Sequence, residues 1–599
     1  MNKTRILSLC LSVLMLLTAS VPALAYEAGT YSAEAAGNNG PVKVEVEMDG
    51  QSILAVRVVE HAETPGICDL PIEQIPQAIV AGQTLAVDVV SGATNTSVAI
   101  LKAAEECIKQ AGGDVEALKA AAIVEEEEKQ IEVTTDVLVV GAGIAGLSAA
   151  IAAREAGAEV VLLEKQGIVG GSMGISGGGF AAVESYLEKE TGFEDSVENA
   201  VERWKNWGTL WGVQHPEGRD GWPVEERITF IAENTAENID WMRAHGIEFV
   251  RISPATNNLT RLFPGYKGAG VAQTLLDSAT NAGVAVYMQT PATDLIMKDG
   301  AVAGVVAKNG NTTYQIYGNV IMATGGYSAN AEMVAEYTPE YAGTISVSAS
   351  GNTGDGLKMA LEAGAVLYDD PWVISYMPQM ADSMMANEKA SGLSGSYTSH
   401  LMVNKDGSRF INESSWYAAL SNAIVMLSGG SAYSIFDSSD ADTVAMLEAG
   451  LETGEVFKGD TLEALAAEFG ADAATFAENV KKYNTIVETG IETDFPLAST
   501  AANGSATQND SPYTAVKQGP YYALRFHAAH MGTMGGVVTN DNACVLNAEG
   551  TPIEGLWAAG EMSNRPFYDH TYLGSVSLAS YSIMGRVAGE SAAADALNK

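Results

Sequence analysis

The stretch TTDVLVVGAGIAGLSAAIAAREAGAEVVLLEKQGIVGGSMGISGGG, residues 134–179, decides the fold of the main part of the chain. Its apolar run 137–140 predicts a short buried strand, and the GAGIAG turn follows directly. The Ala-rich run 147–156 predicts a helix, and residues 160–163 predict a second buried strand. A strand, a Gly-rich turn, a helix and a strand in this order form a dinucleotide-binding βαβ unit.

Each glycine of the GAGIAG turn has a separate task in such a unit. Gly141 allows the tight turn, Gly143 lets the backbone approach a pyrophosphate, and Gly146 lets the helix pack closely against the strand. The N-terminus of the helix then faces the phosphates. Glu164 ends the second strand, where a carboxylate accepts hydrogen bonds from ribose hydroxyls. The alternative is an ordinary Gly-rich turn in an α/β domain.

The bulk composition narrows the class of protein. The chain has 599 residues, of which 47% are hydrophobic, so it can build several domains with large cores. It carries 74 acidic and 33 basic residues, a formal net charge of −41. Such acidity argues against nucleic acid and against an anionic membrane surface as partners. The seven histidines show no metal-ligand spacing, and we expect no metal site.

Residues 1–25 have the pattern of a secretory signal peptide. Lys3 and Arg5 give the positive start, residues 6–17 give the apolar core, and Ala-Leu-Ala at 23–25 is a cleavage site. The apolar run is short for a retained membrane anchor, which is the alternative. After cleavage three cysteines would remain, Cys68, Cys107 and Cys544. They are odd in number and far apart in the sequence, so they offer no disulfide framework. We therefore expect a secreted or cell-surface protein.

Residues 26–124 are predicted to form a small α+β domain. The alternating run 42–48, the turn Asp49-Gly50 and the run 53–59 predict a hairpin. DVVSGAT, residues 88–94, then precedes a helical run at 97–110. A charged linker at 125–131 separates this domain from the dinucleotide-binding part.

The dinucleotide-binding part is predicted in two pieces, 132–375 and 525–599, with residues 376–524 inserted as a capping domain. The region 183–249 is mainly helical, and strands are expected within 284–326. Trp204, Trp207 and Trp211 share one helix face, which favours a packing role over ligand stacking.

The SGAT motif resembles the small FMN-binding domain of membrane-linked electron-transfer complexes and of some secreted reductases. In that family a flavin transferase attaches FMN to the second hydroxyl of the motif through a phosphoester bond, and the matching residue is Thr94. The alternative is a helix cap formed by Thr94 or Thr96.

Residues 132–599 resemble the fumarate reductase/succinate dehydrogenase flavoprotein family, and the motifs that carry the resemblance include GAGIAG, ATGG, TGDG, HMGTMGG and LWAAGE. The resemblance implies a Rossmann-like FAD-binding domain with an inserted α+β capping domain, preceded by the small α+β FMN-binding domain. FAD is expected to bind non-covalently. Besides the residues of the fingerprint, its expected contacts are Lys165, Gly171, Ser172, Gly177, Gly178, Thr324, Gly325, Gly326, Gly560, Glu561, Ser575, Ser577 and Leu578.

The substrate-binding residues of that family are largely replaced. Tyr417 stands where the proton-donating arginine is expected, and Tyr572 stands where the carboxylate-binding arginine is expected. The Thr-Glu pair and the two histidines fall on other residues, namely Gly392-Leu393, Tyr376 or Met377, and Met531 or Gly532 beside His530. The missing arginines remove charges that would pair with a dicarboxylate.

The replacements are similar to the flavin-dependent 3-ketosteroid dehydrogenases of the same superfamily. There, a tyrosine in the slot of Tyr417 moves a proton beside the ketone. A tyrosine in the slot of Tyr572, with a backbone amide such as that of Gly574, polarises the carbonyl. The later glycine of that segment corresponds to Val576, whose N–H can still donate. Ordinary packing is the alternative for each tyrosine.

Three functions follow as hypotheses. The first is a secreted reductase of an activated C=C bond in an enone or another neutral conjugated carbonyl. Its electrons would pass from a cell-surface donor through FMN to FAD, and the reverse, a ketosteroid-type oxidation, stays an alternative. The second is a carboxylate-substrate reductase of fumarate, urocanate or cinnamate type, with acid roles for Arg261, Arg409, Arg525 or Arg565. The third is an electron-transfer module without catalysis.

Four methionines could line a flexible apolar pocket or fill a core, namely Met377, Met380, Met384 and Met385.

Overall fold

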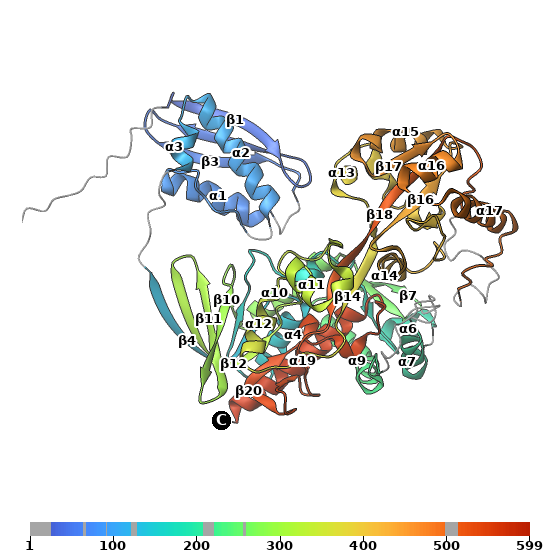
Figure 1. Ribbon diagram of the computed structural model, residues 1–599. Helices are drawn as coiled ribbons and strands as arrows, with labels where there is room; N and C mark the ends of the chain where they lie inside the picture. The colour runs from blue at the N-terminus through green and yellow to red at the C-terminus, as the bar shows by residue number, and fades with distance from the viewer. Residues whose placement is uncertain are drawn as a thin grey trace, which may run out of the picture. The chain divides into compact units, whose positions relative to one another are not determined.

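The computed structural model describes residues 26–63, 68–90, 93–120, 128–193, 195–207, 221–254, 259–497 and 513–598. The predicted signal segment, Trp211 and the Ser-Gly pair of the SGAT motif lie outside these residues. The chain forms two compact units, Met1–Glu126 and Glu127–Lys599 (Figure 1). Within the described ranges no helix combines the length and the apolar character needed to cross a bilayer.

The first unit is a three-stranded antiparallel sheet with helices packed on it. The strands lie in the order β1-β2-β3, and α2 packs on β1 and β2 while α1 packs on β3. Val42, Val44 and Val46 are fully buried, so the alternation in the sequence is the alternation of the two sheet faces. The predicted hairpin is confirmed as β2–β3, and β1 adds to its free edge. The elements are β1 Gly29–Ala36, β2 Pro41–Met48, β3 Ile53–Glu60, α1 Asp69–Gly82, α2 Thr94–Gln110 and α3 Val115–Lys119.

The second unit is built on an eight-stranded sheet in the order β10-β11-β12-β4-β5-β9, with β20 beside β12 and β19 beside β20. The pairs β12–β4, β4–β5, β5–β9 and β12–β20 are parallel, as the βαβ fingerprint predicts. The elements are β4 Lys129–Val140, β5 Val160–Leu163, β9 Ala285–Tyr287, β10 Ala292–Lys298, β11 Ala301–Asn309, β12 Thr312–Met322, β19 Cys544–Leu546 and β20 Pro552–Ala558. Because β4 begins at Lys129, the end of the predicted linker 125–131 is strand.

Two helices cross the sheet side by side, α4 (Ile144–Glu155) and α19 (Val576–Leu597) (Figure 1). A Cβ on Gly585 would lie 2.3 Å from the Ala145 carbonyl oxygen, and a Cβ on Gly589 would lie 2.3 Å from that of Ala149. The glycines of α19 therefore allow the two backbones to approach closely. This contact fixes the first turn of α19 beside the GAGIAG turn.

The inserted region and the segments that flank it form a second sheet of six strands, in the order β13-β18-β16-β15 with β14 and β17 also on β18. The strands are β13 Ile345–Ser346, β14 Trp372–Gln379, β15 Met402–Val403, β16 Ser431–Phe436, β17 Val456–Gly459 and β18 Tyr521–Met534. The helices are α13 Asp382–Met385, α14 Tyr417–Ser428, α15 Ala441–Gly450, α16 Leu462–Phe469 and α17 Ala473–Thr489. Both β14 and β18 run through the predicted domain boundaries at 375/376 and 524/525, and both belong to the six-stranded sheet.

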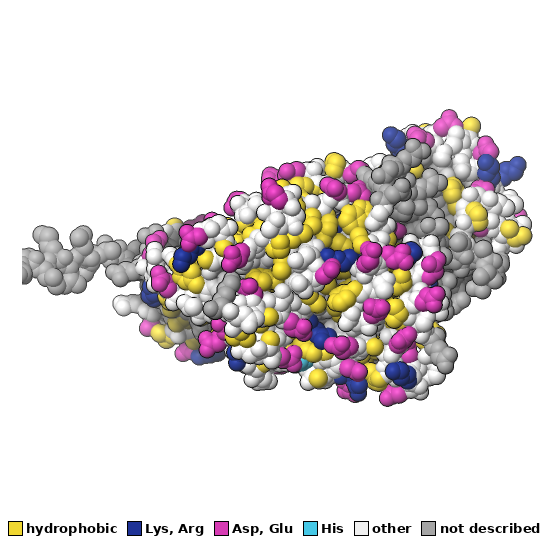
Figure 2. Space-filling view, turned by 90° about the horizontal axis from the view of Figure 1, so that it is seen from below, with side chains coloured by type: hydrophobic (Ala, Val, Ile, Leu, Met, Phe, Trp, Pro, Cys, Tyr) yellow, Lys and Arg dark blue, Asp and Glu magenta, His cyan; other side chains and the backbone are white. Residues whose placement is uncertain are grey.

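A mainly helical layer and a small sheet complete the unit. The predicted helical region contains α6 (Tyr186–Thr191), α7 (Val197–Lys205) and α9 (Glu225–Ala244). The sheet β6-β8-β7 consists of Phe180–Ala181, Arg261–Pro264 and Phe249–Ser253. The remaining helices are α5 Gly171–Gly174, α10 Gly268–Asn281, α11 Ala331–Tyr337 and α12 Asp355–Glu362. Figure 2 shows acidic side chains scattered over one face, in keeping with the net charge.

Candidate active site

A cavity of about 800 Å³ opens at the carboxyl ends of β4 and β5 in the second unit. Of the residues predicted for FAD and for catalysis in this unit, all but two line it. The lining ones are Gly141, Gly143, Glu164, Lys165, Gly171, Ser172, Gly177, Gly178, Thr324, Gly325, Gly560, Glu561, Ser575, Ser577, Leu578, Tyr417, Tyr572 and Gly574. One cavity thus joins the dinucleotide fingerprint to both tyrosines.

The glycines at the dinucleotide end form an open cradle. Gly141 has a φ of +105°, and a Cβ there would lie 2.4 Å from the Ala323 carbonyl oxygen, so only glycine fits. A Cβ on Gly143 would meet nothing closer than the Gly170 carbonyl at 4.0 Å, which leaves its side of the turn open to a phosphate. These residues fit a bound dinucleotide.

Glu164 is held in place by backbone N–H groups. Its Oε2 accepts from Ala142 and its Oε1 accepts from Gln166, both at 2.8 Å. Burial raises the pKa of Glu164, and the two N–H donors oppose the rise. Each carboxylate oxygen has further lone pairs, so both can accept from ribose hydroxyls.

Lys165 also lines the cavity, but its charge is already paired. Its Nζ lies 2.6 Å from Asp355 Oδ2 and 2.7 Å from Thr353 Oγ1. The TGDG motif that opens α12 thereby anchors the loop after β5.

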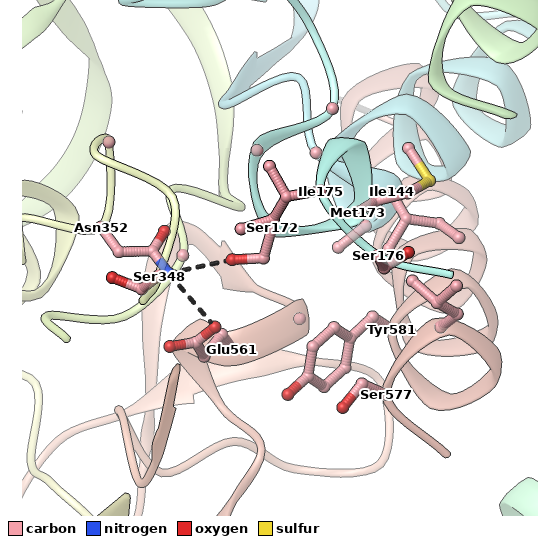
Figure 3. Close-up of a pocket in the computed structure, with 18 of the residues that line it drawn as sticks. Ile144, Ser172, Met173, Ile175, Ser176, Ser348, Asn352, Glu561, Ser577 and Tyr581 are labelled. Carbon is pink, nitrogen blue, oxygen red and sulfur yellow. Dashed lines mark hydrogen bonds between the residues drawn. The ribbon is translucent and has the colours of Figure 1, made fainter. Parts of the chain in front are cut away.

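Glu561, Asn352 and Ser172 form a polar group on one wall (Figure 3). Asn352 Nδ2 lies 3.0 Å from Ser172 Oγ and 3.5 Å from Glu561 Oε2. Glu561 Oε1 accepts from Thr533 N at 2.7 Å and from Thr533 Oγ1 at 2.9 Å. Burial raises the pKa of Glu561 to about 7. Asn352 is a cavity residue that the sequence motifs did not indicate.

Two predicted FAD contacts, Gly146 and Gly326, do not line the cavity. A Cβ on Gly146 would lie 1.8 Å from the Gly141 carbonyl, and a Cβ on Gly326 would lie 2.0 Å from Thr533 Oγ1. Both glycines allow close packing behind the cavity wall. For Gly146 this agrees with the helix-packing role expected of it, whereas the expected contact of Gly326 with FAD stays a prediction.

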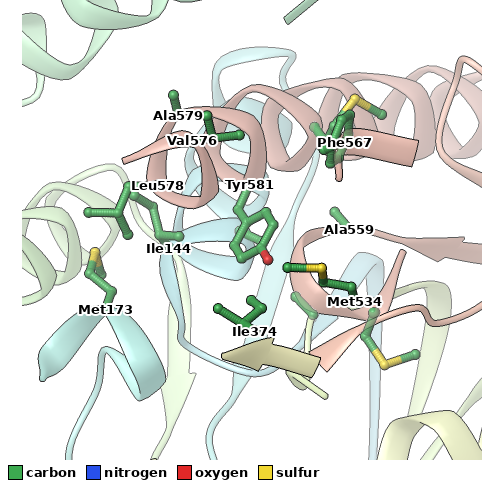
Figure 4. Close-up of a cluster of buried hydrophobic side chains, with 14 of the residues drawn as sticks. Ile144, Met173, Ile374, Met534, Ala559, Phe567, Val576, Leu578, Ala579 and Tyr581 are labelled. Carbon is green, nitrogen blue, oxygen red and sulfur yellow. The ribbon is translucent and has the colours of Figure 1, made fainter. Parts of the chain in front are cut away.

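The first turn of α19 forms the floor between the two ends of the cavity. Ser575 has a φ of +72°, an uncommon conformation for a non-glycine residue that costs of order 1–3 kcal/mol. The N–H groups of Ser577 and Leu578 follow in the first helical turn, where they lack intrahelical partners and can serve a cofactor carbonyl. Tyr581 lies in the apolar cluster beneath them, with Ile144 and Leu578 near it (Figure 4).

The predicted catalytic residues meet at the other end. Trp207 Nε1 and Trp416 Nε1 both donate to the Tyr572 carbonyl oxygen at 3.0 Å. Tyr417 is the first residue of α14, and its ring centroid lies 4.4 Å from that of Trp416 and 5.9 Å from that of Tyr376. Trp207 is 1% exposed, and the expected packing role of the Trp204–Trp207 face is confirmed by the buried contacts of both indoles.

Both phenols remain protonated over a wide pH range. Burial raises the pKa of Tyr417 well above 10, and the neighbouring Tyr572 adds to the rise. Burial also raises the pKa of Tyr572, while hydrogen bonds with Ser577 and the Ser575 backbone oppose it. Each side chain can therefore donate a proton or a hydrogen bond at neutral pH.

Of the four arginines considered for acid roles, only Arg261 lines the cavity. Arg409 is buried between Glu413 and Glu492, with Nη2–O distances of 2.6 and 2.8 Å. Arg565 is buried and lies 2.9 Å from Asp370, and Arg525 lies 3.6 Å from Glu455. Roles at the substrate were wrong for these three, because their charges are paired in the protein.

Of the two alternatives for the four methionines, core filling rather than cavity lining agrees with the structure for Met380 and Met384. None of the four methionines of 377–385 lines the cavity, and Met380 and Met384 are buried in the core. His530 is also buried away from it, with Nε2 3.1 Å from the Ser328 carbonyl and Nδ1 3.0 Å from Thr344 Oγ1. Tyr376 and Met531, which stand at the slots of the family's two histidines, line the cavity, and the lining residues that no motif indicated include Phe263, Ile374 and Trp416.

Thr94 lies in the first unit as the first residue of α2, and it is exposed. The helix is capped at Ala93 without a side-chain hydrogen bond, so the alternative of a Thr94 cap is wrong. Thr96 is buried and donates to Glu63 Oε2. Thr94 is therefore an exposed residue whose side chain does not cap α2.

Comparison with known proteins agrees with this arrangement. Residues 136–578 match the FAD binding domain, and residues 37–109 match the FMN-binding domain. The urocanate reductase of Eggerthella lenta is 33% identical over 95% of this chain and 92% of its own length. The solved open conformation of a flavocytochrome c3 fumarate reductase is 32% identical with a TM-score of 0.57, over 78% of this chain and 79% of that one. The 3-ketosteroid-Δ4-(5α)-dehydrogenase of Rhodococcus jostii RHA1 shares the fold, with a TM-score of 0.59 and 24% identity over 78% and 98% of the chains. The chain therefore belongs to the FAD-binding-domain family of flavin-dependent oxidoreductases that includes urocanate and fumarate reductases, with an FMN-binding domain at its N-terminal side.

Proposed function

We propose that this protein reduces an activated C=C bond conjugated to a carbonyl group. The single observation that carries the proposal is that Tyr417 and Tyr572 share one cavity with the GAGIAG turn. Reduction of such a bond requires a hydride at the β carbon, a proton at the α carbon and stabilisation of the enolate. Bound FAD supplies the hydride chemistry in this cavity.

The side chains divide the remaining tasks. Tyr417 holds the proton for the α carbon, since its buried phenol stays protonated. Tyr572 and the backbone N–H of Gly574 bind the oxygen on which negative charge develops. The indole donors of Trp207 and Trp416 fix the backbone at Tyr572 and so keep its phenol in position.

The electrons are proposed to come from outside the second unit. A flavin transferase would attach FMN to the exposed Thr94, and a cell-surface donor would reduce that FMN. Electrons would then pass from the first unit to the cavity of the second. This direction favours reductase activity over ketosteroid-type oxidation, and the predicted signal peptide supports a location outside the cytoplasm.

The cavity leaves two substrate classes in competition. The tyrosines in place of the family's arginines favour a neutral enone. Arg261 lies in the cavity wall and favours an anionic oxygen on the substrate. The other three candidate arginines are each paired with an acidic side chain of the protein.

Anaerobic turnover with reduced methyl viologen tests the proposal. We expect viologen oxidation when a conjugated enone or enoate is added, and formation of the saturated product by mass spectrometry. Oxidation by no alkene of either class would contradict the proposed function and would favour an electron-transfer module.

A further inference from the structure

We propose that Ser577 is a positioning residue for alkene reduction, and that its hydroxyl makes the Tyr572 phenol a stronger hydrogen-bond donor to the carbonyl oxygen of the substrate. This inference rests on the proposed function and concerns the same site. It adds a residue that acts on the substrate only through Tyr572.

The phenol oxygen of Tyr572 has two hydrogen-bond partners in the protein. Burial raises the pKa of Tyr572, and hydrogen bonds with Ser577 and the Ser575 backbone oppose the rise, so both partners stabilise negative charge on the phenol oxygen. A phenol has a single proton to donate. When a bound carbonyl oxygen accepts that proton in the cavity, Tyr572 can only accept from Ser577. The Ser577 hydroxyl is then the donor.

Two buried phenols can supply the donors that the Ser577 oxygen needs in this arrangement. Tyr568 Oη lies 2.7 Å from Ser577 Oγ, and Tyr581 also forms a hydrogen bond with Ser577. Figure 3 shows the hydroxyls of Ser577 and Tyr581 directed toward the same part of the cavity wall. A serine hydroxyl accepts two hydrogen bonds and donates one. With two phenols donating to it, Ser577 keeps its own proton for Tyr572.

Asn564 fixes the direction of the hydrogen bonds at the far end of this group. The Gly535 N–H donates to Asn564 Oδ1 at 2.8 Å, and Asn564 Nδ2 donates to the Thr533 carbonyl oxygen at 2.8 Å. These backbone partners set the orientation of the amide, so Nδ2 also donates to Tyr581 Oη at 2.6 Å. Tyr581 accepts there and has its own proton left for the hydroxyl cluster around Ser577.

This chain of donors suits stabilisation of charge rather than delivery of protons. Asn564 is fully buried and Tyr581 is 8% exposed, and hydrogen bonds in a shielded chain polarise one another. As charge develops on the enolate oxygen, the Tyr572 proton shifts toward it, and Ser577 stabilises the charge that this leaves on the phenol oxygen. The chain ends on an amide, which does not supply protons, so Tyr417 stays the proton source.

A double-mutant cycle in the FAD-loaded full chain tests the proposal, because it isolates an effect that passes through Tyr572. The measurement is anaerobic reoxidation of the dithionite-reduced protein by stopped flow, with (E)-4-phenylbut-3-en-2-one, (E)-cinnamate and fumarate as probes. With the probe that wild type reduces fastest, Ser577→Ala is expected to slow reoxidation about tenfold, as suits the loss of one hydrogen bond. In the Tyr572→Phe background the same substitution should change the rate by less than about twofold.

Ser580→Ala is the matched control. It removes a buried hydroxyl from the same helix, one that donates to the Val576 carbonyl oxygen at 2.9 Å and does not line the cavity. Its reoxidation rate should stay within about twofold of wild type, because a small loss of stability alone does not alter the donors around Tyr572.

Each other outcome overturns a distinct claim. An unchanged rate in Ser577→Ala, or equal losses in the wild-type and Tyr572→Phe backgrounds, would overturn the positioning role of Ser577. A Tyr572→Phe rate equal to that of wild type would overturn the donor role of Tyr572 and this inference with it. Reoxidation by none of the three probes would overturn the proposed function itself.

A second variant covers the case in which Ser577→Ala does not retain FAD. Tyr581→Phe keeps the ring and removes only the hydroxyl that links Asn564 to Ser577. A loss of about threefold that disappears in the Tyr572→Phe background supports the proposal. An unchanged rate in Tyr581→Phe contradicts it.

Discussion

The indole N–H of Trp416 donates to the backbone carbonyl of Tyr572 across 3.0 Å. Trp416 immediately precedes Tyr417, so this bond joins the start of α14 to the loop before α19. Trp207 donates to the same oxygen from a third segment. The two phenols are thus held together by residues that are far apart in the sequence.

Tyr417→Phe should remove the proton source and leave the cofactor site intact. We expect a loss of about 100-fold or more in the rate of alkene reduction, in the range of general-acid catalysis. FAD content should not change. The matched control is Tyr376→Phe, which alters the neighbouring phenol. Stopped-flow measurement of flavin reoxidation by the alkene checks the prediction, and equal rates for wild type and Tyr417→Phe would refute the assigned role.

The pH dependence of alkene reduction should show no basic limb from Tyr417 below about pH 9. Its pKa is raised above the ordinary value of 10 by burial, so the phenol keeps its proton as the pH rises from 6 to 9. The measurement is kcat/KM from pH 6 to 10 for wild type and Tyr417→Phe. A basic limb below pH 9 that disappears in the variant would show that the phenol is more acidic than its burial implies.

Trp207→Phe should lower the reduction rate as well as the stability. The variant loses one of two donors to the Tyr572 carbonyl, which costs about 1 kcal/mol of stability or more and loosens the backbone that carries the phenol. The control is Trp204→Phe, which loses a donor to the Phe567 carbonyl instead. We expect a similar loss of stability in the control with kcat nearly unchanged. Equal kcat in both variants would argue against a positioning role for Trp207.

Arg409→Met should destabilise the protein without changing the KM for the substrate. Breaking a buried ion-pair network by removing one partner costs about 3–5 kcal/mol. Burial alone would raise the pKa of Glu492, but hydrogen bonds and the charge of Arg409 bring it below 4.5. The stabilisation is therefore present above about pH 4.5 and is lost as acid protonates Glu492.

Urea unfolding of the FAD-loaded protein measures this effect. Lys482→Met, in an exposed pair with Glu478, is the control and should leave the midpoint unchanged. A change in KM with an unchanged midpoint for Arg409→Met would instead return Arg409 to the substrate site.

Thr94→Val should abolish covalent FMN, while Thr94→Ser should retain it. Both variants keep the fold of the small domain, because Thr94 is exposed and caps no helix. Flavin fluorescence of the band on a denaturing gel reads the result directly. Fluorescence that persists in Thr94→Val would place the attachment elsewhere.

The parts of the fold that local patterns determine were predicted from the sequence. The βαβ unit and the hairpin β2–β3 follow from apolar periodicity and turn residues, which act over a few positions. The domain boundaries within β14 and β18 could not be predicted, because each strand continues without interruption across the predicted boundary. The family's motifs indicated Tyr417 and Tyr572, and both line the cavity.

The role of Arg261 could not be separated from those of the other arginines by sequence alone. Arg409, Arg525 and Arg565 are paired with acids distant in the chain, such as Glu492 and Asp370. Only the tertiary structure shows that Arg261, unlike the other three, forms no ion pair with a described acidic side chain.

Anaerobic mixing of the dithionite-reduced protein, freed of excess reductant, with a conjugated alkene tests the central claim most directly. Rapid reappearance of the oxidised FAD band together with the saturated product is the predicted result for wild type, with slow reappearance in Tyr417→Phe. FAD that stays reduced with every conjugated acid and ketone offered would contradict the account.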